Sequence, residues 1–471
     1  MTERDPARFN LAAYVLDAGR ARPDHPALEV LGGGPRLSHG ALLRAVERRA
    51  GALAALGLPG GARVLLRLGN SPDFPVTHLA CAAAGLVPVP TSALLTEAEI
   101  GPMAKRIAPA LAVHEPGIAL PPGVRAVEAA DLDGPALPFA DWPRGDAERL
   151  GYLVFTSGSG GAPKAVAHAH RAVLARRAMW EGWYGLRASD RMLHAGAFNW
   201  TYTLGTGLLD PWAIGATALI PAPDTAAEAL PTLMAEHGAT IFAAAPGVYR
   251  RLLRGAIPPL PALRHGLSAG EALPPATRAA WREATGTDVH EALGMSECST
   301  FVSGSPARPA PEGWSGHVQP GRVARVRDGH LEVGRGDPGL MLGYWEDGAP
   351  RAPEGEWFPT GDLVEEAGDG AIRHLGRADA MLNPGGYRVS PVEVEAALAG
   401  LPVEDVAVGE VRTDGGATVL AAYYVGPPLD QAAADAHAAA RLARYKQPRM
   451  WLRRERLPRN PNGKLIRAEL R

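Results

Sequence analysis

The most constraining feature of this sequence is an alternation of helical patterns with short apolar runs near its N-terminus. Between Ser38 and Gly57, which could cap the two ends of a helix, apolar side chains recur at helical spacing. An apolar run at 64–68, a second helical pattern at 76–84 and another apolar run at 87–89 follow. Helices that alternate with short buried strands are typical of an α/β fold, so we predict α/β layers with parallel-rich sheets.

The second half of the chain carries a different pattern. Glycine and proline occur at close intervals from 329 to 370, which indicates short strands joined by turns. Further expected elements are a helix over 392–398, strands over 406–411 and 419–425, and a helix over 431–440. We predict a large N-terminal domain over residues 1–378 and a small mobile α+β domain over residues 379–471.

Composition and charge exclude several classes of protein. With 471 residues, the chain is too long for one ordinary hydrophobic core. Its 48 basic and 50 acidic residues give a net charge of -2, so we expect neither nucleic acid nor an anionic membrane as a partner. The sequence has no apolar run of about 18 residues, no export signal at its N-terminus, and only two cysteines, Cys81 and Cys298. We therefore expect a cytoplasmic protein without a membrane span.

Lysine is rare in this chain. Of the 48 basic residues only Lys105, Lys164, Lys446 and Lys464 are lysines, and the others are arginines. A lysine retained against such a bias can supply a compact, mobile charge that the planar guanidinium cannot. Lys164 and Lys464 are therefore the first candidates for chemistry.

A possible phosphate-binding loop follows one of the apolar runs. The run begins at Tyr152 and enters a segment of glycine and hydroxyl residues that ends in Lys164. Glycines let backbone N–H groups converge on phosphate oxygens, hydroxyls add donors and lysine adds charge. The spacing is not that of a Walker A loop, and taken alone a surface turn would fit these residues about as well. The candidate phosphate ligands are Thr156, Ser157, Gly158, Ser159, Gly160, Gly161 and Lys164.

Six further stretches follow this loop along the chain. They are Ser268–Pro274, Gly294–Glu297, Thr360–Asp362, Gly376–Asp379, Gly385–Glu395 and Pro461–Lys464. Together with the loop they resemble, in order and spacing, the adenylate-forming superfamily, which includes acyl-CoA synthetases, firefly-type luciferases and the adenylation domains of peptide synthetases. The resemblance spans essentially the whole chain, and is greatest to medium-chain acyl-CoA synthetases and benzoate-CoA ligases.

The resemblance implies a role for each matching residue. Lys164, Glu297 and Lys464 would be catalytic, and Glu297 would also hold Mg²⁺ against the phosphates of ATP, since a hard cation prefers oxygen ligands. Asp362 and Arg377 would bind the ribose. The other implied ATP-binding residues are Gly270, Glu271 and Ala272 at the adenine, and Gly294, Met295 and Ser296. The hinge between the domains would be Asp379, and the channel for coenzyme A would be lined by Gly385, Gly386, Tyr387 and Arg388.

These roles imply an ATP-dependent acid–CoA ligase whose substrates are a small carboxylic acid, ATP and coenzyme A. The acid would be a medium-chain or aromatic one. It would be activated as acyl-AMP with release of pyrophosphate, and its acyl group would then pass to coenzyme A. Two alternatives stay open. One is a stand-alone enzyme that loads an amino or aryl acid onto a carrier protein, and the other is a non-catalytic binding protein with the same fold.

Two residues of the loop depart from the family pattern. Gly160 replaces a usual threonine and Ala165 a usual glycine, so one phosphate-directed hydroxyl is missing. A hydrogen bond to a charged group contributes about 1.5 to 3 kcal/mol, so its loss would weaken ATP binding or turnover without excluding either. Met295 also stands where related enzymes often have a polar residue.

The acid would bind close to the adenine motif. Acetate-specific relatives have an aromatic residue at the position of Gly294, so we expect this pocket to be open to a ring or a medium chain. The expected lining is Phe198, Trp200, Tyr202, Leu204 and Gly294, which is mainly apolar, as such pockets usually are. Ordinary core packing of these aromatic residues is the alternative.

Histidine and cysteine residues near the motifs do not suggest a metal site. His168 and His170 follow the loop, where we expect a helix, and their spacing would point them to different helical faces. We expect surface or packing roles for both. Cys298 is expected to be a small buried residue, because no motif supplies a base for it.

Overall fold

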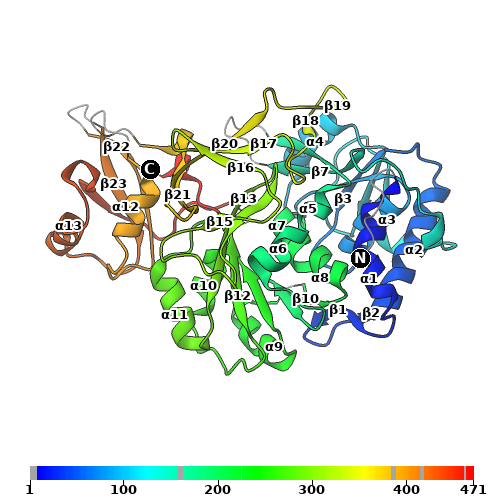
Figure 1. Cartoon of the computed structure of the whole chain (residues 1–471), viewed down its shortest axis with the longest axis horizontal. Helices are drawn as coiled ribbons and strands as arrows, with labels where there is room; N and C mark the ends of the chain where they lie inside the picture. The colour runs from blue at the N-terminus through cyan, green and yellow to red at the C-terminus, as the bar shows by residue number, and fades with distance from the viewer. Residues whose placement is uncertain are drawn as a thin grey trace.

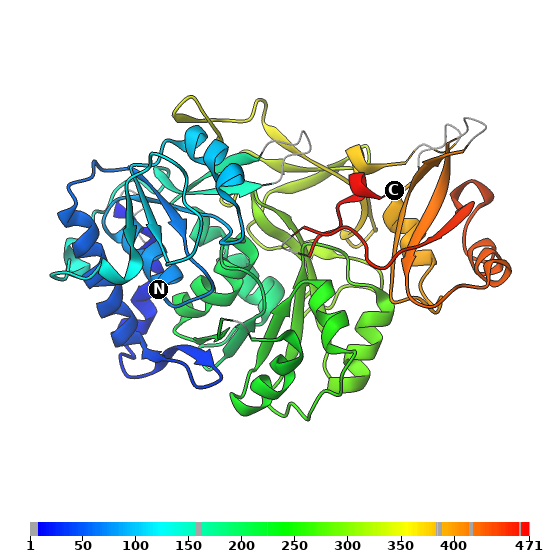
Figure 2. The same ribbon diagram turned by 180° about the vertical axis from the view of Figure 1, so that it is seen from behind.

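The molecule has two parts of unequal size. The computed structural model describes residues 8–156, 163–223, 225–382, 384, 389–413, 418–460 and 463–470. A large body contains the N-terminal and central elements, and a smaller unit of orange and red elements lies at one end of it (Figure 1). In the reverse view, the last segment of the chain returns from this unit toward the large body (Figure 2). No described helix combines the length and the apolar character that a membrane crossing requires.

The alternating pattern near the N-terminus forms a parallel sheet with helices packed against it, as predicted. Ser38 caps α2 (His39–Ala55), because its hydroxyl accepts a hydrogen bond from the Ala41 amide at 3.2 Å. The second predicted helix is α3 (Asp73–Ala83). The strands, all parallel and in spatial order, are β4 (Val87–Pro90), β3 (Arg63–Arg67), β5 (Leu111–His114) and β6 (Ala126–Glu128).

Within the described residues, the largest sheet has thirteen strands. Its parallel part runs through β1, β10, β9, β11, β12 and β13, and antiparallel pairing takes over at β14. This mixed sheet confirms the predicted α/β class. In spatial order its strands are β16 (Ala324–Arg327), β17 (His330–Gly334), β20 (Trp357–Glu366), β21 (Ala371–Arg377), β15 (Gly316–Val318), β14 (Ser299–Ser303), β13 (Val289–Met295), β12 (His265–Ala269), β11 (Ile241–Ala244), β9 (Arg191–His194), β10 (Thr217–Pro221), β1 (Pro26–Leu31) and β2 (Arg36–Ser38).

Short helices connect these strands. Trp281 of α11 and Tyr249 of α10 pack on Phe242 of β11, and the three aromatic rings bury one face of the sheet. Two π-helical segments, Trp180–Tyr184 and Gly205–Leu209, interrupt the α-helical ones. The remaining α-helices of the large body are α1 (Leu11–Arg20), α4 (Glu97–Ile107), α5 (Ala172–Ala175), α6 (Arg177–Met179), α7 (Thr201–Leu204), α8 (Asp210–Ile214), α9 (Leu230–Glu236), α10 (Pro246–Leu252) and α11 (Pro275–Thr285).

The predicted phosphate loop connects two antiparallel strands, β7 (Leu150–Thr156) and β8 (Lys164–Ala169). β18 (Gly343–Glu346) pairs with β8, and β19 (Ala349–Arg351) completes this sheet. His168 lies in β8, so the helix expected after the loop is wrong. The reason is that β8 is buried on both faces beyond Lys164, and such a strand shows no alternation of polar and apolar residues. His170 follows the strand, and both histidines are buried, in agreement with packing roles.

The small unit has its own sheet and core. Its strands are β22 (Asp405–Arg412), β23 (Thr418–Val425) and β24 (Met450–Arg453), and its helices are α12 (Pro391–Ala397) and α13 (Gln431–Ala439). Val408 and Leu420 pack with both helices on one face, whereas Tyr423 packs with Leu457 and Leu470 on the other. The predicted α+β character is thereby confirmed, and the domain boundary at residue 378 stays a prediction.

A fully buried ion pair fixes the start of β14. The side chains of Arg322 and Asp337 have no exposed surface, and their closest atoms are 2.8 Å apart. The guanidinium also donates to the carbonyls of Thr300 at 2.7 Å and Cys298 at 2.8 Å. Two backbone amides donate to the carboxylate, so both charges are fully hydrogen-bonded.

Replacing Arg322 should therefore be strongly destabilising. Arg322→Ala leaves the Asp337 carboxylate buried without its counter-charge, and we expect the free energy of unfolding to fall by about 3 to 5 kcal/mol. Arg351→Ala is the matched control, because its pair with Glu346 is 3.5 Å long and its side chain is 76% exposed; that change should cost less than about 1 kcal/mol. Denaturant unfolding monitored by tryptophan fluorescence measures both, and equal effects would contradict this account.

Candidate functional site

The predicted phosphate loop lies between two strands that pair with each other. Thr156, the last residue of β7, stands opposite Lys164, the first residue of β8, in the antiparallel register. The pairing of β7 with β8 thus holds both ends of the loop close together. The loop residues Ser157, Gly158, Ser159, Gly160 and Gly161 lie outside the described residues.

A lysine, a tyrosine and a glutamate form a connected cluster beside this loop. The Lys164 ammonium lies 4.8 Å from the centre of the Tyr344 ring, within cation–π range. The Tyr344 hydroxyl donates a hydrogen bond of 2.9 Å to Oε1 of Glu297. Burial, and then the neighbouring Glu297 charge, raises the pKa of Tyr344, so this residue stays a proton donor. Two of the predicted catalytic residues are therefore brought together.

The turn that carries Glu297 is held by hydrogen bonds to its carbonyl groups. It joins β13 to β14. His168 lies 2.7 Å from the carbonyl of Ser296 through Nε2, and the Met341 amide donates to the carbonyl of Glu297 at 2.7 Å. Together with the Arg322 guanidinium, these contacts fix the turn from three separate segments of the chain. Glu297 itself is buried.

Gly294 packs directly on the neighbouring strand. A Cβ at this position would lie 2.4 Å from the carbonyl oxygen of Ser299 and from Cα of Thr300. Any side chain there would have to displace β14, so glycine is required by the hairpin itself. Met295 follows as the last residue of β13 and pairs with Ser299. Whether Gly294 also leaves one wall of an acyl pocket open stays a prediction.

The two predicted ribose ligands lie on facing strands. Asp362 of β20 stands opposite Arg377 of β21, and the shortest distance between their charged atoms is 3.7 Å. Arg377 also donates to the carbonyl of Thr360 at 2.6 Å, and His374 donates to Asp362 at 3.1 Å. Burial opposes ionisation of Asp362, but the His374 hydrogen bond and the Arg377 charge hold its pKa below the ordinary value. The carboxylate is therefore ionised and ready to accept hydrogen bonds.

The predicted adenine motif contacts the predicted acyl lining. Gly270 has a φ of +97°, and a Cβ there would lie 2.9 Å from the Trp200 ring, so this position requires glycine. Glu271 follows and accepts hydrogen bonds from the C-terminal part of the chain. Ala272 is exposed at the same edge.

Besides Gly294, the predicted lining residues of the acyl pocket divide into two kinds. Phe198 is buried and stacks edge-on against Phe74 at 5.7 Å, and Tyr202 donates to the carbonyl of Leu267 at 3.2 Å. These contacts are those of core residues. Trp200 is only partly buried, and Leu204 lines a small cavity. The acyl pocket as such stays a prediction.

Lys464 lies in a tight hairpin that reaches the large body. The Lys464 amide donates to the side chain of Asn460 at 2.9 Å, and the Asn460 amide returns a bond to the Lys464 carbonyl at 2.8 Å. The next residue, Leu465, donates its amide to Oε1 of Glu271 at 2.8 Å. The lysine side chain is exposed. The hairpin that carries the predicted catalytic lysine is thus docked on the predicted adenine motif.

Four charged residues join the two parts of the molecule, and we call them the ionic clasp. Arg459 lies 3.2 Å from both carboxylate oxygens of Glu271 and 2.9 Å from Asp405. Asp405 in turn lies 2.7 Å from Arg250 on α10. All four side chains are mostly buried, so their attraction is only weakly screened by water.

Of the remaining predicted site residues, the backbone of one lies within the described part of the chain. Asp379 lies in the short 3₁₀ turn Ala378–Ala380, which leads from β21 toward the small unit. Gly385, Gly386, Tyr387 and Arg388 lie outside the described residues. The hinge and the coenzyme A channel therefore stay predictions.

Three side chains that hold predicted site residues in place could not be predicted from the sequence. Tyr344, His374 and Arg459 belong to none of the predicted motifs, yet they contact Glu297, Asp362 and Glu271. The pairing of β18 with β8 brings Tyr344 to the site, and the β20–β21 register brings His374 there. Only His374 lies beside a predicted motif, because it precedes Gly376 by two residues.

The described residues contain no group of three or more His, Cys, Asp or Glu side chains that could hold a metal by themselves. Glu297 fits a different type of site. A Mg²⁺ ion commonly takes one or two carboxylates and completes its shell with water and phosphate oxygens. Tyr344 occupies one oxygen of Glu297, and among the described residues the other has no hydrogen-bond partner. The donor set therefore fits a Mg²⁺ ion bound together with a phosphate ligand.

Comparison with known proteins identifies the family. The model of the family described as AMP-binding enzyme matches residues 16–345. The chain belongs to the AMP-binding enzyme family. The resemblance to the adenylate-forming superfamily, predicted from the ordered motifs, is thereby confirmed.

Curated relatives of this AMP-binding enzyme include two aromatic acid ligases. The anthranilate–CoA ligase of Pseudomonas aeruginosa is 32% identical over 90% of this chain and 89% of the relative. The 3-hydroxybenzoate–CoA ligase of Aromatoleum sp. is 30% identical over 95% of this chain and 93% of the relative. These two relatives are thus matched over almost their full length.

Solved structures agree with the fold. The anthranilate CoA ligase AuaEII, in complex with anthranoyl-AMP, superposes with a TM-score of 0.88 at 26% identity, over 99% of this chain and 97% of that one. ATP-bound MatB from Rhodopseudomonas palustris gives a TM-score of 0.87 at 26% identity, over 98% of each chain. These likenesses confirm the predicted fold class.

Breaking the ionic clasp should loosen the small unit. Asp405→Asn removes the charge that both Arg250 and Arg459 contact, and we expect a loss of about 1 to 2 kcal/mol, which moves the equilibrium between docked and detached orientations about 5- to 30-fold. Small-angle X-ray scattering should then give a larger radius of gyration than for the parent protein. Glu404→Gln is the matched control, because its carboxylate pairs with Arg254 in an exposed position. Identical scattering from Asp405→Asn and the parent would contradict the role of the clasp.

Proposed function

We propose that this AMP-binding enzyme is an ATP-dependent aromatic acid–CoA ligase. The observation that carries the proposal is the hydrogen bond from the Leu465 amide to Glu271, because it holds Lys464 against the adenine motif. The curated relatives act on anthranilate and 3-hydroxybenzoate, which supports an aromatic acid as substrate. The anthranoyl-AMP bound to AuaEII supports an acyl-adenylate intermediate.

The first half-reaction converts the acid into an acyl-AMP. A carboxylate is a poor acyl donor because its oxygen leaves badly, whereas AMP leaves readily. An oxygen of the acid attacks the α-phosphorus of ATP, and the bond to pyrophosphate breaks. Lys164 and Lys464 contribute positive charge where negative charge accumulates in the transition state. Asp362 is ionised and accepts hydrogen bonds from the ribose hydroxyls, which fixes the nucleotide in place.

Mg²⁺ would be held by Glu297 together with phosphate oxygens of ATP. The Tyr344 hydroxyl fixes one oxygen of this carboxylate and thereby orients the other. When bound, the ion compensates the charge of the phosphates. Lys164, next to Tyr344, adds a second positive charge on the protein side.

The second half-reaction transfers the acyl group to a thiol. The sulfur of coenzyme A attacks the acyl carbon, and AMP leaves. For this step the small unit turns about Asp379, withdraws Lys464 and brings Gly385 to Arg388 to the thiol channel. A carrier-protein thiol is the second candidate, because one relative is named for ligation to AMP and not to coenzyme A. This relative, the p-hydroxybenzoic acid–AMP ligase FadD22 of Mycobacterium tuberculosis, is 32% identical over 98% of this chain and 68% of that protein.

A panel of carboxylic acids tests the proposed function. Pyrophosphate release is measured with acetate, octanoate, benzoate, aminobenzoates and hydroxybenzoates, with and without coenzyme A. We expect an aromatic acid to give the highest kcat/KM and to yield a thioester when coenzyme A is present. Acetate as the best substrate would contradict the aromatic assignment. Pyrophosphate release without any coenzyme A thioester would favour the carrier-protein reaction, and no release with any acid would favour a non-catalytic protein.

Lys464→Ala tests the division of work between the half-reactions. Removal of one preorganised charge contact costs about 2.7 to 4 kcal/mol, so pyrophosphate release should fall about 100- to 1000-fold. The variant should still convert synthetic acyl-AMP and coenzyme A to thioester at close to the parent rate. Lys464→Arg should restore little, because a planar fork does not replace a compact charge. Lys446→Ala, which removes a lysine paired with Glu393 in the small unit, is the control and should be normal in both steps. Normal adenylation by Lys464→Ala would remove this lysine from the mechanism.

A further inference from the structure

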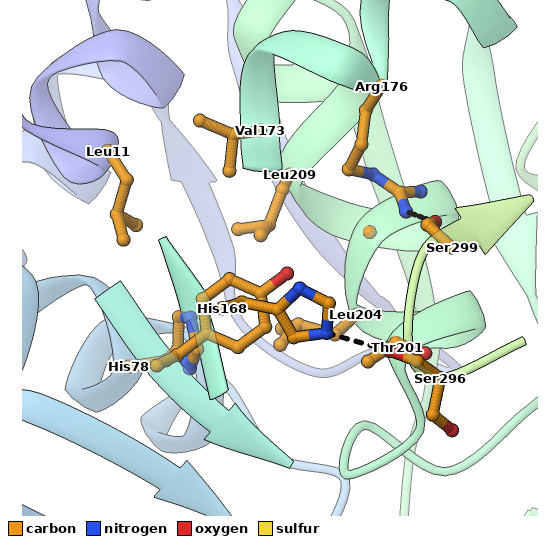
Figure 3. A pocket seen from close by; sticks show the side chains of 12 residues that line it. Leu11, His78, His168, Val173, Arg176, Thr201, Leu204, Leu209, Ser296 and Ser299 are labelled. Carbon is orange, nitrogen blue, oxygen red and sulfur yellow. Dashed lines mark hydrogen bonds between the residues drawn. The ribbon is translucent and has the colours of Figure 1, made fainter. Parts of the chain in front are cut away.

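A small cavity lies behind the turn that carries Glu297. Its volume is about 20 Å³, which is room for about one water molecule or one group of that size. Leu204, one of the predicted acyl-pocket residues, lines one side of it, and Ser296, the neighbour of Glu297, lines another (Figure 3). The cavity therefore lies between the predicted wall for the acid and the predicted ATP motif.

His168 offers this cavity a hydrogen-bond acceptor. Its Nε2 lies 2.7 Å from the Ser296 carbonyl, which can only accept, so Nε2 carries the proton and Nδ1 does not. Burial lowers the pKa of His168 to about 4, so the ring is neutral at pH 7. Nδ1 is buried without a hydrogen-bond partner among the described residues, in a side chain that is 2% exposed. A group that enters the cavity therefore has to supply a donor to satisfy this nitrogen.

Ser299 and Tyr152 offer this cavity hydrogen-bond donors. Nη1 of Arg176 donates to the Ser299 hydroxyl oxygen at 2.6 Å, so the serine proton points elsewhere (dashed line in Figure 3). Tyr152 also lines the cavity, and its ring stacks on that of His168 with 4.8 Å between the centroids. Burial raises the pKa of Tyr152 to about 12, so its hydroxyl keeps its proton. The hydroxyls of Ser299 and Tyr152 and the imidazole of His168 thus lie among the polar groups that line one small space.

The electrostatics exclude an anionic group. Arg176 is the cation at the cavity, but Asp210 lies 2.7 Å from it, and both side chains are almost fully buried. The pair is neutral as a whole, and the guanidinium also donates to Tyr184, Thr206 and Ser299. A carboxylate in the cavity would therefore be desolvated without a counter-charge, which is strongly unfavourable. The cavity fits a small neutral group.

We infer that this cavity receives a hydroxyl substituent of the aromatic acid, and that His168, Tyr152 and Ser299 recognise it. A hydroxyl can donate to Nδ1 of His168 and accept from Ser299 or Tyr152 at the same time. An amino group satisfies only the first requirement well, and a methoxy group is too large and has no proton to donate. These three are residues that set specificity in the reaction proposed above, and the inference rests on that proposed function.

The test is a comparison of matched acids. For the parent enzyme, kcat/KM for pyrophosphate release is measured with benzoate and with each hydroxybenzoate, aminobenzoate and methoxybenzoate isomer. We expect one hydroxybenzoate isomer to exceed benzoate at least about 10-fold, because a site built to bond a hydroxyl discriminates against the analogue that lacks it. The amino isomer should be intermediate, and the methoxy isomer should be the poorest.

Isosteric variants assign this preference to the cavity. Tyr152→Phe and Ser299→Ala each remove only a hydroxyl, and each should lower the ratio of the preferred hydroxybenzoate to benzoate about 10-fold. Tyr423→Phe makes the same chemical change in the core of the small unit and should leave the ratio unchanged. A fold defect would lower both rates together, so the ratio separates recognition from structural damage.

Two outcomes would overturn the inference. In one, no hydroxybenzoate is preferred over benzoate; in the other, the cavity variants leave the ratio of every isomer unchanged, and the cavity then holds only water. If benzoate is turned over and the variants leave the hydroxybenzoate-to-benzoate ratio unchanged, only this inference is wrong. If no acid is turned over, the proposed function is wrong. In that last case, calorimetric titration of the parent protein with hydroxybenzoate and benzoate still decides, because equal or absent binding would contradict the recognition of a hydroxyl.

Discussion

The site depends on one short turn whose carbonyl groups are bonded from several directions. His168 bonds the carbonyl of Ser296, Met341 bonds that of Glu297, and Arg322 bonds those at the start of β14. A buried turn with unpaired carbonyls would be costly, and a turn so fully bonded has little freedom to move. The Glu297 carboxylate therefore owes its position to residues outside the predicted catalytic set.

Much of the fold could be predicted because its signals are local. The helix after Ser38 needs only its own spacing and its cap, and the apolar runs of the first sheet are short enough to exclude helices. β8 shows where this reasoning fails. All of its residues beyond Lys164 are buried, so it has neither a helical nor an alternating pattern, and the environment that makes it a strand comes from β7 and β18. The information lies in pairing, which no short window of sequence contains.

The residues of the candidate site also divide into those with a local sequence signal and those without one. Lys164, Glu297 and Asp362 could be proposed as site residues because the ordered motifs that contain them resemble those of the adenylate-forming superfamily, and their roles stay predictions. Their partners could not, because a tyrosine or histidine that orients a carboxylate has no fixed distance along the chain. The ionic clasp is the clearest case. Its members come from residues 250 to 459, and only their arrangement in space makes them a unit.

The fully bonded turn also faces two ways. Its glutamate side chain is bonded by Tyr344, next to the predicted phosphate-binding Lys164, while Ser296 and Ser299 border the cavity that we infer to receive the acid's hydroxyl. In the reaction proposed above, acid selection and nucleotide handling would share one stiff piece of backbone, and the two properties would not be independent. A redesign that enlarges the cavity from the turn would shift the carboxylate and show itself as weaker ATP use. The opposite wall, at Thr201 and Leu204, lies on α7 and carries none of the predicted nucleotide-binding residues, so it is the place where substrate range can change on its own.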